Sequence, residues 1–177
     1  MTNYVYIATS LDGFIATADG GLDWLDEIPN PEQSDFGYGD FISGIDAIVM
    51  GRNSFEKVLT FDTWPYDKPV FVLSKSLGSV PKNLASPIEV VRGNLKQLVN
   101  RLHGQGYNNL YIDGGGTIQS FLVEDMIDEI ILTRIPVLLG GGIPLFGSMA
   151  KELRFSHIKT ELFNNALVKS TYSRMRA

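Results

Sequence analysis

The sequence of 177 residues contains no cysteine and only two histidines. Without cysteine the chain cannot form a disulfide, use a thiol nucleophile or bind zinc through thiolates. His103 and His157 do not have the spacing of a metal-binding pair, so we expect no metal site. Ser10, Ser54 and Ser74 have no histidine base beside them in the sequence, which therefore predicts no hydrolytic triad.

An excess of basic charge and a long hydrophobic run are also absent. The net charge is −5, so no global positive field attracts nucleic acid or anionic lipid. No apolar run approaches the length of about 18 residues that a membrane-spanning helix needs. The first seven residues lack the basic region that precedes the apolar core of a secretory signal. We therefore expect a cytoplasmic protein with no nucleic-acid and no membrane partner.

What is present is the composition of an ordinary globular protein. Hydrophobic residues make up 44% of the chain and charged residues 20%. A chain of this length is most simply one domain with a sizeable core. We therefore expect a single domain over residues 1–177.

Strand-like and helix-like segments alternate through the middle of the chain. We expect strands at 4–8, 45–50, 69–73, 88–91, 109–113 and 128–134, and helices at 35–43, from 55 onward, at 95–102 and at 117–122. Residues 155–163 and 167–175 indicate a terminal hairpin around Asn164-Asn165. Residues 9–23 are expected to form a mobile loop and 136–147 another loop. The pattern predicts an α/β fold with a mostly parallel sheet and an antiparallel C-terminal edge.

The most informative segment is a strand-to-helix junction at Gly51-Arg52-Asn53-Ser54. The hydrophobic residues 48–50 stop at a glycine, and a cation and two small polar residues then precede the helix. The free N–H groups and the dipole of a helix N-terminus suit a phosphate, which Arg52 would reinforce. The alternative is an ordinary helix start in which Asn53 is the cap.

A second junction of this kind lies at residues 110–118. Asp113 ends an apolar strand and precedes Gly114-Gly115-Gly116, after which a helix begins. A glycine triplet lets another molecule approach the backbone closely, although it also suits a tight turn or tight helix–sheet packing. Two such junctions indicate a nucleotide or another phosphate-bearing ligand.

Three polar residues at strand ends are further candidates for binding a phosphate. Ser74 and Lys75 end one buried strand, and Arg92 follows the next. They suit the extra phosphate of an NADP-type cofactor, but polar residues are also common at strand ends.

Two acids are candidates for proton transfer. Asp35 precedes an aromatic cluster, and Asp113 lies at the end of an apolar strand. A carboxyl group against apolar walls has a raised pKa and can relay a proton or hold an amino-heterocycle. The alternatives are a solvated loop acid for Asp35 and a turn-stabilising acid for Asp113.

Taken together, these segments resemble the dihydrofolate reductase superfamily, and more closely its branch related to the reductase domain of bacterial riboflavin biosynthesis, the RibD C-terminal type. The resemblance covers nearly the whole chain in order. It rests on residues 7–16, 22–24, 49–56, 72–75, 112–118 and 132–136. It implies a dihydrofolate reductase-like fold of three α/β/α layers.

The resemblance also implies NADPH as the cofactor and hydride transfer as the reaction. Ala8 and Ile15 would border the nicotinamide. The phosphates and the adenosine ribose would be held by Gly51, Arg52, Asn53, Ser54, Leu73, Ser74 and Lys75, while Gly114, Gly115, Gly116, Thr117 and Ile118 would cover the pyrophosphate. Thr133 would border the substrate pocket, and Asp35 falls where dihydrofolate reductases carry their pterin-binding acid.

Some residues match the riboflavin branch better than classical dihydrofolate reductases. The riboflavin-type enzymes have an acid at the position of Asp113, where classical enzymes have an apolar residue. Lys68 falls near the arginine with which classical enzymes hold the folate tail, but a lysine lacks the bidentate fork. The zinc-binding signature of the deaminase domain often fused to these reductases is absent, so the chain would be reductase only.

We therefore expect an NADPH-dependent reductase of a small heterocyclic substrate. The first expected substrate is a ribosylaminopyrimidine, as in 5-amino-6-(5-phosphoribosylamino)uracil reductase. The alternatives are a dihydrofolate reductase and an NADP-binding protein with little catalysis. The apolar segments 137–139 and 143–146 would also support a homodimer, unless they belong to the core.

Overall fold

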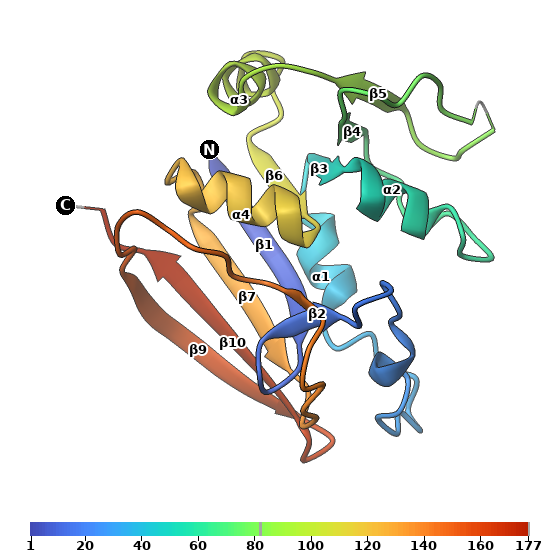
Figure 1. The fold of residues 1–177 in the computed structure, drawn as a ribbon, viewed down its shortest axis with the longest axis vertical. Coiled ribbons are helices and arrows are strands. Elements are labelled where there is room, and N and C mark those ends of the chain that lie inside the picture. Colours follow the sequence, from blue (N-terminus) through green and yellow to red (C-terminus); the bar gives the residue numbers. More distant parts are fainter. Residues whose placement is uncertain (82, 177) are drawn as a thin grey trace.

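The computed structural model describes residues 1–81 and 83–176 and contains an eight-stranded central sheet (Figure 1). In sheet order the strands are β5 (Ile88–Val91), β4 (Val70–Leu73), β3 (Ala47–Gly51), β6 (Asn109–Asp113), β1 (Thr2–Thr9), β7 (Glu129–Arg134), β10 (Leu167–Arg174) and β9 (Phe155–Phe163). The strands from β5 to β7 are parallel, whereas β10 and β9 are antiparallel. The expected mostly parallel sheet with an antiparallel C-terminal edge is confirmed.

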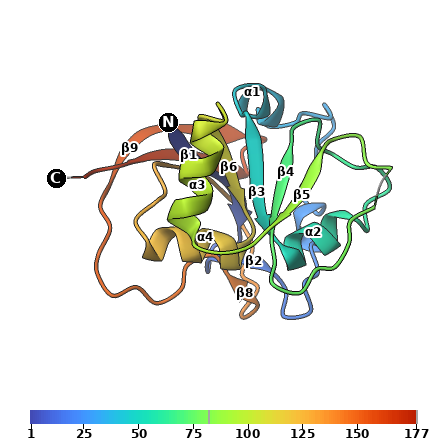
Figure 2. The same ribbon diagram turned by 90° about the horizontal axis from the view of Figure 1, so that it is seen from above.

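Helices cover both faces of this sheet (Figure 2). They are α1 (Tyr38–Ser43), α2 (Arg52–Val58), α3 (Leu95–Gly104) and α4 (Gly115–Val123), with a short 3-10 helix η1 (Asp23–Leu25). Side chains of α1 and α2 pack in one hydrophobic cluster with β3, β4 and Tyr111, and side chains of α3 and α4 pack in another with β1, β3 and β6. The three-layer α/β/α arrangement is therefore confirmed.

The central strands are continuous hydrophobic runs because both of their faces are covered. In β3, the residues from Ala47 to Met50 are all fully buried, and alternate side chains enter the two clusters. Such runs are typical of parallel strands between two helical layers. Apolar residues without period-2 alternation thus place the middle of the chain at the centre of the fold.

The C-terminal hairpin forms as the sequence predicts. Strands β9 and β10 pair antiparallel, and the turn residues Asn164 and Asn165 both have φ of 52°. Asparagine is one of the few residues other than glycine that adopts this left-handed conformation readily. The local sequence therefore determines both the turn and the strand pairing.

A small second sheet lies where the sequence predicts only loops. Strand β2 (Phe14–Ala16) from the expected loop 9–23 pairs antiparallel with β8 (Ile143–Pro144) from the expected loop 136–147. The two segments are about 130 residues apart in the chain, so no local pattern could have shown the pairing. This pairing fixes the middle of the loop that was expected to be mobile.

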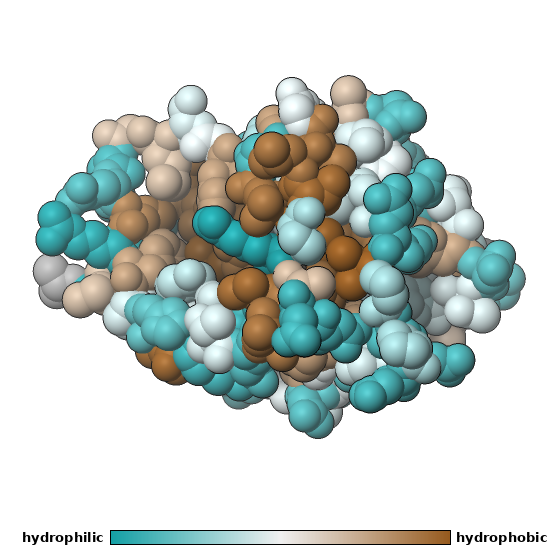
Figure 3. All heavy atoms as spheres, turned by 90° about the horizontal axis from the view of Figure 1, so that it is seen from below, coloured by the Kyte–Doolittle hydropathy of each residue, from teal (hydrophilic) through white to brown (hydrophobic). Residues whose placement is uncertain are grey.

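The two apolar segments that were expected to support a homodimer are only partly exposed. Leu145 is fully buried, whereas Leu138, Ile143 and Phe146 are exposed. Figure 3 shows hydrophobic residues gathered in the middle of the face seen from below. The homodimer stays a prediction.

Among the described residues no helix is long and apolar enough to cross a membrane.

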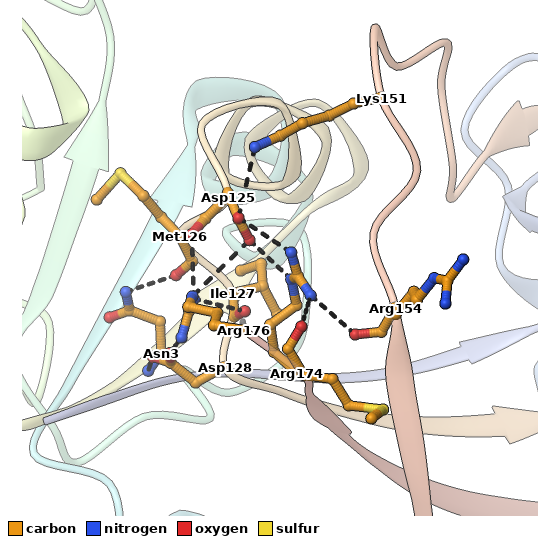
Figure 4. A network of polar contacts seen from close by, with 10 residues as sticks. Asn3, Asp125, Met126, Ile127, Asp128, Lys151, Arg154, Arg174 and Arg176 are labelled. Carbon is orange, nitrogen blue, oxygen red and sulfur yellow. Dashed lines mark hydrogen bonds and ion pairs between the residues drawn. The ribbon is translucent and has the colours of Figure 1, made fainter.

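A polar network attaches the C-terminal segment to the start of β7 (Figure 4). Asp125 accepts hydrogen bonds from Arg174 Nε at 2.8 Å and Nη2 at 3.0 Å, and Arg176 pairs with Asp128. Asp128 also accepts the backbone N–H of Asn3 at 2.7 Å. The network therefore links the strand at the start of the chain to the strand at its end.

Replacing Arg174 with methionine should lower the free energy of unfolding by about 2–3 kcal/mol at neutral pH. The side chain of Arg174 is only 9% exposed, so its two hydrogen bonds to Asp125 are poorly replaced by water. These bonds are the largest cause that lowers the pKa of Asp125. A lowered native pKa stabilises the fold above the unfolded value of about 3.9, and this contribution disappears as the pH falls through the native value. Urea unfolding at several pH values would measure it.

Arg154 supplies the control for this substitution. Its side chain pairs with Glu152, and both are 76% exposed. Such a pair contributes little, so Arg154→Met should change stability by less than about 0.5 kcal/mol. Equal losses in the two variants would contradict our interpretation of the network.

Candidate active site

A cavity of about 700 Å³ lies at the carboxyl ends of the central strands. Ala8 from β1 and Asp113 from β6 lie in its wall, together with residues at the starts of α2 and α4 and in the segment 15–25. In open α/β sheets, ligands bind in the crevice at the carboxyl ends of the strands. The parallel topology therefore places this cavity where a ligand site is expected.

The two strand-to-helix junctions adjoin each other at this edge. Met50 of β3 is the register partner of Asp113 of β6, so the two strands end side by side. A Cβ atom on Gly51 would lie 2.8 Å from the Thr117 hydroxyl of α4, which shows how closely the two helix starts approach. The alternative, in which Asn53 is the cap, is not found, because α2 begins at Arg52 and no side chain caps it. Asn53 instead lines the cavity.

The three glycines of the triplet differ in how closely other residues approach them. Gly114 has φ of +86°, and a Cβ atom there would lie 2.0 Å from Ser54 Oγ. A Cβ on Gly115 would lie 2.7 Å from the side chain of Ile15. Gly116 has no atom of another residue within 4 Å of such a position and is exposed. Close packing within the protein thus accounts for the first two glycines, while the third leaves the start of α4 open to a ligand.

Cationic and hydroxyl groups gather at the ends of β4 and β5. Arg52 Nη1 donates to Ser76 Oγ at 2.9 Å, which joins the start of α2 to the residues after β4. The Ser74 hydroxyl accepts the N–H groups of Ser76 and Leu77 and so shapes this turn. Ser74 N–H donates to Val91, the residue before Arg92. The structure therefore brings Arg52, Lys75 and Arg92, three residues that are far apart in sequence, to one edge of the sheet.

Asp113 is the partly buried acid of the cavity wall. Its carboxyl oxygen Oδ1 lies 3.2 Å from the Tyr111 hydroxyl. Burial raises the pKa of this carboxyl above its ordinary value, while the Tyr111 hydroxyl and the Gly114 N–H act in the opposite direction. A carboxyl group with a raised pKa keeps its proton to higher pH, which suits a general acid.

Asp35 has a different environment from the one expected. It is exposed, and its two carboxylate oxygens accept the N–H groups of Gly37 and Gly39, both at 2.8 Å. These bonds lower the pKa of Asp35, so the expected raised value is not found. The acid instead organises the start of α1, which begins at Tyr38 and not at residue 35. Asp35 does not line the cavity.

The structure brings eight of the expected site residues together and leaves the others elsewhere. Those that line the cavity are Ala8, Ile15, Asn53, Ser54, Asp113, Gly114, Gly115 and Gly116. Ile118 packs in the hydrophobic core and Thr117 is buried against Gly51, so their side chains face protein. Thr133 is 8% exposed on β7 between Ala8 and Lys169, outside the cavity wall. Leu73 also packs against the core.

Sequence reasoning did not find several cavity residues, among them Tyr6, Lys57, Tyr66 and Tyr111. Tyr111 is two residues before Asp113 on one strand, so period-2 alternation places both side chains on one face. Lys57 follows Ser54 by three residues, which is about one helical turn. Tyr66 lies between α2 and β4 in a segment without regular structure, and no local pattern indicates its position.

The arrangement suits reduction more than hydrolysis. The cavity wall contains the partly buried acid Asp113, the exposed acid Asp19, three phenols and a single cation, Lys57. The open start of α4, together with the cations near β4 outside the cavity wall, suits a dinucleotide phosphate. Beside it, Asp113 and the phenols suit a planar heterocycle. The residues present therefore fit a nicotinamide dinucleotide beside a small substrate.

Comparison with known proteins identifies the family. The model of the RibD C-terminal domain matches residues 4–169. The chain belongs to this family. It is 38% identical over 167 residues to the uncharacterized protein YwjB of Bacillus subtilis (strain 168), with 92% of each chain covered. The crystal structure of a protein from Shewanella sp. PV-4, assigned by name to riboflavin biosynthesis, is 50% identical with a TM-score of 0.96, and 99% of this chain and 100% of that chain are covered.

More distant relatives of this RibD-type chain include a named reductase. The 2,5-diamino-6-ribosylamino-4(3H)-pyrimidinone 5′-phosphate reductase of Methanothermobacter thermautotrophicus is 29% identical over 180 residues, covering 80% of this chain and 81% of the relative. A dihydrofolate reductase from Enterococcus faecalis, complexed with NADP(H), has a TM-score of 0.64 at 17% identity, with 98% of this chain and 96% of that chain covered. The fold is therefore dihydrofolate reductase-like, and the family supports an oxidoreductase.

Proposed function

We propose that this chain is an NADPH-dependent reductase of a ribosylaminopyrimidine phosphate. The observation that carries the proposal is the position of Asp113. Its carboxyl group lies at the wall of the cavity, and Asp113 is two residues before the first residue of α4. A proton donor and a phosphate-binding helix start are thus adjacent, as a reduction by hydride and proton requires.

The residues of the chain would divide the work between the cavity and the cations near β4 and β5. NADPH, when bound, would supply the hydride. Arg52, Lys75 and Arg92 would hold the adenosine phosphate, and Gly116 would let the pyrophosphate approach the start of α4. Asp113 would give its proton to the substrate atom that gains electron density. Ala8 and Ile15 would exclude water from the reacting atoms.

The relatives support this reading of the cavity. The archaeal relative is named for the reduction of a ribosylaminopyrimidinone phosphate, and the dihydrofolate reductase binds NADP(H) on the same fold. Dihydrofolate reduction has weaker support in this chain, because Asp35 is exposed and its oxygens are used by Gly37 and Gly39. A binding protein with little catalysis would retain the phosphate site without needing Asp113.

Calorimetric titration should show tighter binding of NADPH than of NADH, by at least about tenfold. Lys75→Gln should weaken NADPH binding by about five- to tenfold and leave NADH binding unchanged, because it removes one cation from the 2′-phosphate. The NADPH affinity should also fall as ionic strength rises.

Lys159→Gln is the matched control, since Lys159 lies on β9 at the opposite edge of the sheet. It should leave both affinities unchanged. Equal affinities for NADPH and NADH in the unaltered protein would remove the phosphate site at the ends of β4 and β5.

A further inference from the structure

The Tyr111 ring is held rigidly beside Asp113. Tyr111 is 6% exposed, and its ring packs edge-on against Phe41 of α1 with centroids 5.2 Å apart. Its hydroxyl group therefore has a fixed position, and only the hydrogen on that oxygen can turn. A phenol hydroxyl has one hydrogen to donate and lone pairs to accept.

That hydroxyl has two partners that compete for its hydrogen. It lies 3.0 Å from the carbonyl oxygen of Tyr6 and 3.2 Å from Asp113 Oδ1. The pairing of β1 with β6 ends at Tyr4 and Tyr111, so the hydroxyl bridges the two strands just beyond their ladder. A carbonyl oxygen can only accept. When Tyr111 donates to Tyr6, its contact with Asp113 is a hydrogen bond only if the carboxyl group carries the proton.

Ionisation of Asp113 reverses this arrangement. A carboxylate only accepts, so the Tyr111 hydrogen must turn from the Tyr6 carbonyl to Asp113 Oδ1. The other groups facing Asp113 are neutral phenols, from Tyr38 of α1 and from Tyr66, with Tyr6 nearby. Lys57 and Asp19 line other parts of the cavity wall. Tyr111 is therefore the side-chain donor that the carboxylate has when it loses its proton.

We propose that Tyr111 is a positioning residue whose hydroxyl hydrogen switches from the Tyr6 carbonyl to Asp113 when Asp113 gives its proton to the substrate. This inference rests on the proposed function. NADPH, when bound, would supply a hydride to the substrate carbon; the π electrons of the reduced bond would move to its nitrogen or oxygen, and Asp113 would protonate that atom. Asp113 is left as a carboxylate, which Tyr111 stabilises until water returns the proton.

Kinetics test the role of the switch in catalysis. Tyr111→Phe should lower kcat about tenfold, since it removes one hydrogen bond to the carboxylate formed in the step. The high-pH limb of kcat should move up by about one unit, because the carboxyl group holds its proton more tightly without that donor. The KM for NADPH should not change. Tyr4→Phe is the control: Tyr4 is the register partner of Tyr111 on the neighbouring strand, and it should leave the pH profile unmoved.

Nuclear magnetic resonance tests the switch in the unaltered protein without turnover. With carboxyl-labelled aspartate and ring-labelled tyrosine, the Cζ signal of Tyr111 should move with the same midpoint as the Asp113 carboxyl signal. The Asp113→Asn and Tyr111→Phe variants assign the two signals. A Tyr111 signal that stays constant while Asp113 titrates overturns the proposal, as does a Tyr111→Phe pH profile identical to that of the unaltered protein. If the unaltered protein reduced no substrate while the two signals still shared a midpoint, the proposed function would be overturned and the switch of the Tyr111 hydrogen would stand.

Discussion

Replacing Asp113 with asparagine should lower kcat about 100- to 1,000-fold while the affinity for NADPH stays within about twofold, the range expected for loss of a general acid. An amide has nearly the shape of the carboxyl group, so the cavity should keep its form. It has no acidic proton to give to the substrate. Steady-state kinetics together with calorimetric titration would separate the loss of chemistry from a loss of binding.

The same substitution should raise stability at neutral and higher pH, although it lowers kcat. Burial raises the pKa of Asp113, so the native state binds its proton more tightly than the unfolded state does. Stability therefore falls as the pH rises from the unfolded value of about 3.9 through the raised native value. Asp113→Asn removes this loss, and its melting temperature should exceed that of the unaltered protein at pH 8 but not at pH 3.

Asp35→Asn provides the contrast. Asp35 organises the start of α1 through Gly37 and Gly39, so its loss should lower the melting temperature and leave kcat within about twofold. If Asp35→Asn abolished turnover and Asp113→Asn did not, the acid would be the one that dihydrofolate reductases use. If neither changed any reaction, the chain would be a binding protein.

Replacing Gly114 with alanine should lower the free energy of unfolding by about 2–4 kcal/mol, the sum of backbone strain and overpacking. Gly114 has φ of +86°, and its new Cβ would lie 2.0 Å from Ser54 Oγ and 3.1 Å from Ser54 Cβ. The two helix starts would have to separate to make room. For a chain of this size each kcal/mol lowers the melting temperature by about 2–4 °C, which differential scanning calorimetry would detect.

Gly116→Ala is the matched control two residues further on. Gly116 is in the first turn of α4 without a left-handed φ, and nothing lies within 4 Å of its added Cβ. Its replacement should raise stability by up to about 1 kcal/mol, because alanine restricts the unfolded chain. The double variant Gly114→Ala with Ser54→Ala should recover part of the loss but not the share due to φ. Equal effects at the two glycines would show that the junction is less closely packed than the structure indicates.

Local patterns in the sequence predicted most of the elements because these elements follow short-range rules. Asn94 accepts the N–H groups of Lys96 and Gln97 at the start of α3, the ordinary role of an asparagine at a helix N-cap. Strand β6 runs from Asn109 to Asp113, the range that its apolar run indicates. Asp113 could be selected from the sequence as a candidate for proton transfer because a carboxyl group at the end of an apolar strand is unusual.

Other parts of the site depend on contacts between distant segments. The β2–β8 pair and the position of Tyr66 in the cavity wall have no local signature. The environment of Asp35 differs from the expectation because the N–H groups of Gly37 and Gly39 donate to its oxygens in the turn before α1. The pKa of an acid depends on what surrounds it, and its surroundings come from the whole fold.

The sequence by itself determined the layered α/β fold, the two strand–glycine–helix junctions and the resemblance to the RibD branch, because periodicity, turn residues and motif order are properties of the chain. Only the tertiary structure decided that Asp113 is enclosed while Asp35 is exposed, that Gly114 packs against Ser54, and that Tyr111 lies between Asp113 and the Tyr6 carbonyl. Burial and hydrogen bonding between residues far apart in the chain are set by how the strands and helices pack, and they determine which acid keeps its proton.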